Sequence, residues 1–384
     1  MIPYGKQTIS QADIDAVVDV LSSNFITQGP KVGEFEHAIA SKIGAKYAIA
    51  SNSATSSLHL ACLALGLREG LRLWTSPNTF VASANCGLYC GAEVDFVDID
   101  PVSYNLCPEK LAEKLALAKQ ENTLPHVLVA VHMCGQSCDM EAIHRLSKQY
   151  GFKVIEDASH AIGGRYQGDY IGSCRYSDIT VFSFHPVKII TTAEGGMAIT
   201  NDLALAKALE SLRSHGVTRD PAELVDAGQG AWYYEQQGLG YNFRMTDLQA
   251  ALGVSQLTRL DAFVKRRNAL ARRYNRLLEN LPLATPTLLE SCESAWHLYV
   301  IQLAEPDCRR HVFDTLRAKG IGVHVHYIPV HTQPYYRELG FDWGQFPVAE
   351  NYYHAALSLP LFFDMTEDEQ DQVVAALTEA LNAK

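Results

Sequence analysis

The sequence predicts an α/β protein, with a large and mostly parallel sheet followed by a smaller α+β portion. Short apolar runs alternate with helical stretches over residues 46–184, which is typical of a parallel sheet with helices on both faces. After about residue 245 the pattern changes to long helical periodicity and then to two further apolar runs. We therefore expect a large domain over residues 1–250, with an N-terminal arm over 1–25, and a linking helix and small domain over 251–384.

Two helices are expected before the sheet begins. The first follows Ser10, a suitable N-cap, with Asp13 at the third helical position. The second covers residues 32–43 and stops at Gly44, because glycine readily adopts the left-handed conformation that ends a helix. The remaining expected elements of the large domain are strands at 46–50, 72–75, 93–99, 126–132, 153–156 and 179–184, and helices at 54–66, 108–119 and 139–150.

The last third of the chain is expected to be helical first and mixed afterwards. Residues 246–278 have helical periodicity, and the basic side chains expected on the exposed face are Lys265, Arg266, Arg267, Arg272 and Arg273. Strands at 296–303 and 321–328, separated by a helix, and a final helix at 366–382 predict the small α+β domain. Residues 215–235 have poor periodicity and predict a long loop, which in a compact protein is usually functional.

The composition argues against several classes of protein. A formal net charge of -11 disfavours nucleic acid or an anionic membrane as partner, because both need a basic face. No apolar run reaches the roughly 18 residues of a membrane span, and residues 1–10 lack the pattern of a signal peptide. The nine cysteines have neither CxxC pairs nor histidine partners at metal-ligand spacing, so no metal site is predicted. We expect a soluble, cytoplasmic protein with reduced cysteines.

Three polar features follow expected strands and could meet at the carboxyl edge of the sheet. The strand in "KVIEDASHAIGG" ends at Asp157, which could otherwise be a simple turn cap. In "FSFHPVKIITTAEGG", Lys188 lies between an apolar run and a Glu-Gly-Gly turn, where it is either a solvated surface charge or a partly buried amine with a chemical role. In "SNSATSSLHLACLALG", a Ser/Thr-rich turn leads into a helix, where it is either an N-cap or a phosphate cradle.

Together these three features fit pyridoxal 5′-phosphate (PLP). That cofactor needs a lysine amine for covalent attachment, an acidic partner for its pyridine nitrogen and an anion site for its phosphate. Asp157 would keep the nitrogen protonated, so that the ring can withdraw electrons from an adjacent carbanion. Lys188 needs a depressed pKa to attack and to carry protons, which a partly buried setting supplies. The combination is more specific than any of its parts.

Eight segments spread over nearly the whole chain carry a family resemblance: "YGKQTISQADIDAVVDVLSSNFITQGPKVGEFE", "GAKYAIASNSATSSLHLA", "TSPNTFVASANC", "VHMCGQSCDM", "VIEDASHAIGG", "FSFHPVKIITTAEGG", "GYNFRMTDLQAALGVSQL" and "HVHYIPVHTQPYY". On these the sequence resembles the DegT/DnrJ/EryC1/StrS family of PLP-dependent sugar aminotransferases. The resemblance implies the fold type I architecture of PLP-dependent transferases, which is aspartate aminotransferase-like.

The resemblance also implies roles for individual residues around the cofactor. Lys188 matches the lysine that binds PLP covalently, and Asp157 matches the partner of the pyridine nitrogen. The other positions that match cofactor contacts are Ser183, Thr55 and Ser56 at the phosphate, Phe80 on the ring (or in the core), His160 near the phenolic oxygen, and Asn242. In the family, the segment of Asn242 reaches the phosphate in the partner subunit, which implies a homodimer with a shared active site. The neighbouring Arg244 could make that contact instead.

Further polar residues near these motifs are candidates for the substrate. We expect His185, His326, Tyr327 and Arg244 to contact the sugar ring or the diphosphate, without transferring protons. Arg213 and Arg219 are further candidates for the diphosphate. We interpret His324 as a core residue, because a histidine in an apolar strand is usually satisfied there. Since side chains alternate along a strand, His324 and His326 are expected on one face and Tyr327 on the other.

The expected activity follows from the resemblance. It implies amination of a UDP-linked 4-keto-6-deoxy-N-acetylhexosamine with L-glutamate as donor, in pseudaminic acid biosynthesis. Some family members carry His in place of Lys188 and act as dehydratases, so the lysine points to transamination. Leu71 replaces a usually acidic residue in a turn where no effect on chemistry is expected. The alternatives are another sugar, nucleotide or ring position, or a non-catalytic regulator; an NAD-dependent oxidoreductase is disfavoured because no GxGxxG follows a strand.

Overall fold

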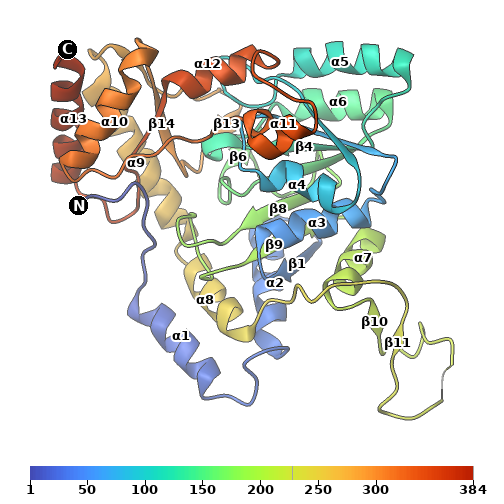
Figure 1. Cartoon of the computed structure of the whole chain (residues 1–384). Helices are drawn as coiled ribbons and strands as arrows, with labels where there is room; N and C mark the ends of the chain where they lie inside the picture. Colours follow the sequence, from blue (N-terminus) through green and yellow to red (C-terminus); the bar gives the residue numbers. More distant parts are fainter. Residues whose placement is uncertain (227, 384) are drawn as a thin grey trace.

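The computed structural model describes residues 1–226 and 228–383 and confirms the predicted α/β class (Figure 1). Its centre is a seven-stranded sheet with the strand order β1-β9-β8-β5-β4-β2-β3. These strands are β1 (Tyr47–Ser51), β2 (Arg72–Thr75), β3 (Glu93–Phe96), β4 (Val127–Val131), β5 (Lys153–Asp157), β8 (Ile179–Ser183) and β9 (Gly196–Thr200). Only β9 is antiparallel to its neighbours, and the other pairs are parallel. All five residues of β4 are buried apolar side chains, as expected for a central parallel strand.

The helices of this part lie around the sheet, and most of them begin at a residue whose side chain caps the helix. They are α1 (Gln11–Leu21), α2 (Pro30–Ile43), α3 (Ala54–Ala64), α4 (Ala82–Tyr89), α5 (Pro108–Glu121), α6 (Met140–Tyr150), α7 (Leu203–Arg213) and α8 (Asp247–Leu257). The predicted capping box of Ser10 and Asp13 is present at α1. Asp13 is also fully buried and accepts from Ser255 Oγ at 2.6 Å and from Gln256 Nε2 at 2.8 Å, so the cap ties α1 to α8. Gly44 ends α2 with φ 77°, as predicted.

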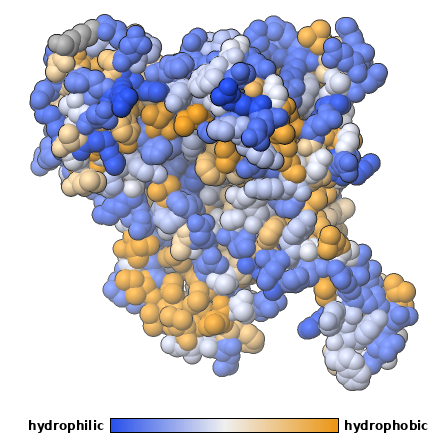
Figure 2. Space-filling model, viewed as in Figure 1, coloured by the Kyte–Doolittle hydropathy of each residue, from blue (hydrophilic) through white to orange (hydrophobic). Residues whose placement is uncertain are grey.

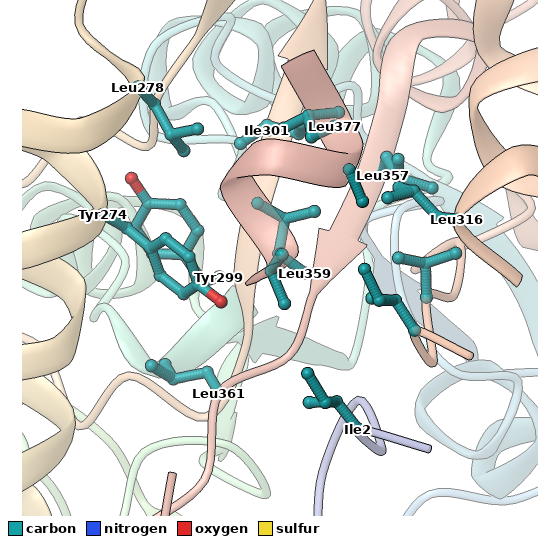
Figure 3. Packing of buried hydrophobic residues seen from close by; sticks show 14 of the residues in the cluster. Ile2, Tyr274, Leu278, Tyr299, Ile301, Leu316, Leu357, Leu359, Leu361 and Leu377 are labelled. Atoms are coloured by element: carbon teal, nitrogen blue, oxygen red, sulfur yellow. The ribbon is translucent and has the colours of Figure 1, made fainter. Parts of the chain in front are cut away.

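The C-terminal part is a small sheet with helices against it. Its sheet has the order β12-β14-β15, formed by β12 (Leu283–Ala284), β14 (Tyr299–Leu303) and β15 (Ala356–Leu359). Its helices are α9 (Leu260–Leu278), α10 (Arg309–Ala318), α11 (Pro334–Glu338), α12 (Pro347–Ala355) and α13 (Glu367–Asn382). A buried cluster that includes Tyr274, Ile301, Leu316 and Leu377 forms its core (Figure 3). Ile2 from the start of the chain packs into this cluster, with its N–H donating to Gly320 O at 2.9 Å.

Shorter pieces complete the chain. They are β6 (Arg165–Tyr166), β7 (Asp169–Tyr170), β10 (Val217–Thr218), β11 (Glu235–Gln236), β13 (Cys292–Glu293) and the 3₁₀ helices η1 (Met133–Gly135), η2 (Pro306–Cys308) and η3 (Val330–Thr332). Among its described residues, the predicted loop at 215–235 contains only the two-residue pairing of β10 with β11 at its ends. Within the described residues, no helix has the length and apolar character needed to cross a membrane.

Two sequence predictions for the C-terminal part are wrong. Residues 321–328 form no strand; they pair with β15 only through the bridge between His324 and Ser358. Beyond that bridge the carbonyl of His326 accepts from Tyr352 Oη at 3.0 Å, so a side chain replaces the next ladder hydrogen bond. Arg267 does not lie on the exposed face of α9. It is 2% exposed and donates to the carbonyls of Trp296, His297 and Leu361, which hold α9 against the small sheet.

Candidate active site

A pocket with a volume of about 520 Å³ lies at the carboxyl edge of the central sheet. Val131, Asp157 and Ser183 line it, and they are the last residues of β4, β5 and β8. The predicted site residues that line this pocket are Lys188, Asp157, His160, Ser183, Thr55, Phe80, His185, His326 and Tyr327. The structure therefore brings together in one cavity residues that are far apart in the sequence. Its volume is in the range of small-molecule binding sites.

Asp157 is held in one orientation at the end of β5. Its side chain is buried, and Ser83 Oγ donates to Oδ2 at 2.6 Å. Its other oxygen, Oδ1, accepts from Ser159 N at 3.1 Å and from Ser159 Oγ at 2.5 Å. A carboxylate held by three donors is a preorganised partner for a further N–H group in the pocket.

Lys188 lies in a loop that leaves β8 and returns into β9. The loop is closed at its base, where Phe184 N donates to Gly195 O at 2.9 Å. Near its tip, Lys188 N donates to His185 O at 2.9 Å. Burial of the amine lowers the pKa of Lys188 to about 8, against the opposing attraction of Asp157. A neutral amine, able to act as nucleophile and base, is therefore accessible near neutral pH.

The turn before α3 forms a second wall of the pocket, beside β9. Ser53 caps α3 by accepting from Ser56 N at 3.1 Å, and Thr55 in the first helical turn lines the pocket. Gly196 allows β9 to approach this turn, because a Cβ atom there would lie 2.4 Å from Ser53 C and O. In the β8–β9 pairing, Gly196 lies opposite Ser183. Backbone amides and hydroxyls thus meet at the positive end of α3, where a phosphate binds well.

His160, Tyr327 and Cys134 form a chain of hydrogen bonds in the pocket wall. Cys134 N donates to His160 Nδ1 at 3.3 Å, and His160 Nε2 lies 3.2 Å from Tyr327 Oη. Burial, with the added effect of Lys188 and His326, holds the pKa of His160 well below its usual range, so the ring is neutral. A neutral ring that accepts at Nδ1 carries its proton at Nε2 and donates it to Tyr327. The hydroxyl proton of Tyr327 is then free to serve another acceptor.

The outer part of the pocket contains three histidines and Tyr4. His326 is buried, and its Nδ1 is hydrogen-bonded to Ser358 Oγ at 2.7 Å. Burial is the main cause that lowers the pKa of His326 to about 3. His324 stacks on His326 with ring centroids 4.6 Å apart, as predicted, but Tyr327, which was expected on the other face, lines the same pocket. Our interpretation of His324 as a core residue is wrong, because it is exposed and lines the pocket. His185 is also exposed there, with Nε2 4.0 Å from Glu194 Oε1.

Five predicted residues are not among those that line this pocket. They are Ser56, Asn242, Arg244, Arg213 and Arg219. The Ser56 hydroxyl donates to Asn52 Oδ1 at 2.7 Å. Arg213 donates hydrogen bonds to the Glu36 carboxylate and to the carbonyl of Ala50. Arg219 lies over the ring of Tyr234, with its Cζ atom 5.8 Å from the ring centroid. Asn242 is exposed and Arg244 is partly buried, both next to α8.

Sequence reasoning missed several polar side chains at the site, among them Thr79, which lines the pocket. Tyr4, Ser83, Ser159 and Glu194 line the pocket or hold Asp157. Ser159 follows Asp157 by two residues, a spacing typical of a side chain that hydrogen-bonds a nearby carboxylate. Tyr4 and Ser83 have no comparable local signal, because tertiary packing alone brings Ser83 to β5 and Tyr4 to residues 324–326. Among the described residues, no group of three or more His, Cys, Asp or Glu side chains could hold a metal ion.

Comparisons with known proteins agree with this geometry. The model of the DegT/DnrJ/EryC1/StrS aminotransferase family matches residues 7–378. The chain is 40% identical over 384 residues to the spore coat polysaccharide biosynthesis protein SpsC of Bacillus subtilis, covering 98% of this chain and 96% of the relative. It is 39% identical over 370 residues to the UDP-4-amino-4,6-dideoxy-N-acetyl-β-L-altrosamine transaminase of Campylobacter jejuni, covering 95% and 93%.

Solved structures of similar proteins share the whole fold. Helicobacter pylori PseC, an aminotransferase involved in the biosynthesis of pseudoaminic acid, superimposes with a TM-score of 0.90 at 30% identity over 100% of both chains. The PLP form of the putative sugar aminotransferase Spr1654 from Streptococcus pneumoniae gives 0.89 at 27% identity, over 99% of this chain and 98% of that one. Fold and pocket therefore define a PLP-dependent transferase. The chain belongs to the DegT/DnrJ/EryC1/StrS aminotransferase family and is a sugar aminotransferase.

Proposed function

We propose that the protein transfers the amino group of L-glutamate to the 4-keto group of a UDP-linked 4-keto-6-deoxy-N-acetylhexosamine, in pseudaminic acid biosynthesis. The observation that carries the proposal is the single pocket that contains Lys188, Asp157 and Ser183. The choice of sugar is supported by the Campylobacter jejuni relative and the Helicobacter pylori structure.

The donor set of the pocket fits PLP. The close approach of Gly196 to the Ser53–Ala54 backbone leaves the start of α3 facing the cavity, where an anionic phosphate is favoured. A fixed carboxylate at Asp157 suits a protonated ring nitrogen. Phe80, 58% exposed and lining the cavity, presents an aromatic face to a planar ring.

Each residue then has a defined task. Bound PLP supplies the electron withdrawal that makes the substrate carbon acidic. Lys188, with its pKa lowered to about 8, would take the proton from that carbon of the amino donor. In the second half of the reaction it would return a proton to the sugar carbon that receives the amino group. Asp157 would pair with the protonated ring nitrogen of PLP, and Ser183 and Thr55 would hold its phosphate. Tyr327 accepts a hydrogen bond from His160, so its own O–H can donate a hydrogen bond to an oxygen of the bound cofactor or substrate.

We propose a homodimer as the functional unit, with Asn242 or Arg244 contributed to the partner's pocket. Both residues belong to a segment outside the pocket of their own chain. An apolar surface also covers α1 and the segment that follows it, at the lower left of Figure 2. Its exposed members are Ile9, Ile14, Val18, Leu21, Phe25 and Ile26, each at least 45% exposed. A patch of this kind is typical of a protein interface.

A second candidate is an aminotransferase for another nucleotide sugar. It is supported by the spore coat relative, whose identity of 40% is as high as that of the Campylobacter jejuni protein at 39%. A regulator that kept only the fold is not favoured, since Lys188 and Asp157 lie in one pocket with serine and threonine hydroxyls that suit an anion.

The test is to incubate the protein with PLP, L-glutamate and a panel of UDP- and dTDP-linked 4-keto sugars, and to follow 2-oxoglutarate. We expect turnover with the UDP-linked 4-keto-6-deoxy-N-acetylhexosamine to exceed that with every dTDP sugar. Higher turnover with another sugar would favour the second candidate. Turnover that persists in Lys188→Ala would exclude the mechanism.

A further inference from the structure

Two buried hydroxyls lie next to Asp157, one hydrogen-bonded to its carboxylate and the other to the first hydroxyl. Thr79 and Ser83 belong to the segment 79–83, which enters α4, and they are 2% and 1% exposed. Thr79 lines the pocket. The two hydroxyl oxygens are 2.8 Å apart, and Ser83 Oγ is 2.6 Å from Asp157 Oδ2. The three side chains therefore form a continuous chain from the pocket wall to the carboxylate.

The direction of these hydrogen bonds follows from the number of protons. An ionised carboxylate only accepts, so Ser83 must give its single hydroxyl proton to Asp157. Ser83 then has no proton left for Thr79, and Thr79 must be the donor between them. The chain runs in one direction, from Thr79 through Ser83 to Asp157, and each bond polarises the next.

The same reasoning assigns the two oxygens of Asp157. Oδ1 accepts two hydrogen bonds, from Ser159 N and Ser159 Oγ, which occupy its two lone pairs. Within the part of the chain that the structure describes, Oδ2 accepts only from Ser83, so it keeps one lone pair. An N–H donor that enters the pocket will therefore find its acceptor at Oδ2, the oxygen that Ser83 holds.

We propose that Ser83 is a positioning residue that aims Asp157 Oδ2 at the pyridine nitrogen of PLP, with Thr79 donating to Ser83 and so polarising its hydrogen bond to the carboxylate. The inference rests on the proposed role of Asp157. The segment that carries Ser83 also carries Phe80, so the aromatic cover of the ring and the anchor of the carboxylate are fixed by one turn.

Three variants separate positioning from simple packing. Ser83→Ala removes the donor, Ser83→Thr keeps a hydroxyl, and Ser137→Ala removes another fully buried hydroxyl, which donates to Cys138 O away from the pocket. The readouts are the PLP dissociation constant by equilibrium dialysis and the pH titration of the visible absorbance of the holoprotein. We expect Ser83→Ala to bind PLP about 10-fold more weakly and to shift that titration, because a hydrogen bond to a charged group is lost. Ser83→Thr and Ser137→Ala should stay near wild type.

Each other outcome has a defined meaning. Ser83→Ala with the affinity and titration of the wild type would overturn the proposal, as would an equal loss in Ser137→Ala. If Ser83→Thr does not fold, the comparison of the two alanine variants decides. A crystal structure of the holoprotein with the pyridine nitrogen on Oδ1 of Asp157 would also overturn it. The Asp157→Asn variant tests the proposed role of Asp157 separately from the positioning role of Ser83. If Asp157→Asn binds PLP as the wild type does, the proposed role of Asp157 itself is wrong.

Discussion

Lys188 shows how a single side chain acquires its chemistry from its surroundings. A lysine on the surface is charged up to about pH 10. In the loop between β8 and β9, burial destabilises the ammonium more than the Asp157 carboxylate stabilises it, and the pKa falls from 10.5 to about 8. The nearby carboxylate thus limits the shift without cancelling it.

This pKa predicts the reactivity of Lys188 in the protein without PLP. The amine should react with acetic anhydride with a midpoint near pH 8, because only the neutral form is a nucleophile. Competitive labelling followed by mass spectrometry measures the midpoint for each lysine. Exposed Lys110 provides the internal control, since its pKa is raised above 10.5 by its hydrogen bond to Glu113. A midpoint for Lys188 as high as that of Lys110 would contradict the prediction.

Tyr327 gives a second prediction at this scale. Burial raises the pKa of Tyr327 above its ordinary value, so the phenol stays protonated and remains a donor. In Tyr327→Phe the pocket loses that donor, and the buried Nε2–H of His160 loses its acceptor. We expect kcat/KM for the keto sugar to fall about 10-fold or more.

The measurement varies the sugar and L-glutamate separately. Because His160 is neutral and Tyr327 protonated, we expect the pH profile of Tyr327→Phe to keep the inflection of the wild type. A changed inflection would show that one of these groups titrates during turnover.

The residues that could be predicted from the sequence are those tied to the end of a strand or to a family motif. Asp157 ends β5 and Lys188 follows β8, so periodicity and the order of the strands sufficed to place both at one edge. Ser83 could not be predicted, because this residue of α4 finds its partner on a strand, 74 residues away. The same holds for Arg267, which helical periodicity placed on the surface and tertiary packing buries.

At the scale of elements, the strands of the central sheet were predicted well because each is a short apolar run with a distinct boundary. The strand predicted at residues 321–328 was wrong for a different reason. Their apolar pattern is that of a strand, but β15 takes the place beside β14, and residues 324–327 become a wall of the pocket. The sequence pattern records burial, whereas the choice of pairing partner depends on segments that are distant in the sequence.

The contact between β9 and the turn before α3 gives a prediction for an element. In Gly196→Ala the new Cβ atom would lie 2.4 Å from Ser53 C and O and 2.5 Å from Ala54 N, all of which are backbone atoms. We expect the turn to move, with a loss of stability of about 1–3 kcal/mol. PLP affinity should fall as well, because the displaced amides belong to the proposed phosphate site. Thermal unfolding with and without PLP measures both effects.

Gly33→Ala is the matched control for this prediction. Gly33 lies in α2 and is exposed, and a Cβ atom added there would have no other atom within 4 Å. Alanine there should be neutral or stabilise the helix by up to about 1 kcal/mol. If Gly196→Ala behaved like Gly33→Ala, the close approach of β9 to the turn would not matter for PLP binding.

At the scale of the whole molecule, α1 stands out because it buries little of itself against its own chain. It is anchored through Asp13 and Val20, while its exposed face carries Ile14, Val18 and Leu21 at helical spacing. In Figure 1 it lies at the lower edge of the molecule, beside α8. An apolar helix face of this kind costs free energy in water, so the proposed homodimer would stabilise the fold and complete the site together.

This arrangement predicts that assembly and activity are lost together. In Ile14→Asp combined with Val18→Asp, two charges enter the apolar face, and we expect a monomer by light scattering coupled to size exclusion. Transamination should fall with it, since Asn242 and Arg244 would no longer reach a partner's pocket. Asp19→Ala changes an exposed polar residue on the same helix and should remain a dimer. A fully active monomer would show that each chain carries a complete site, and the polar side chains of the single-chain pocket would then have to bind the phosphate alone.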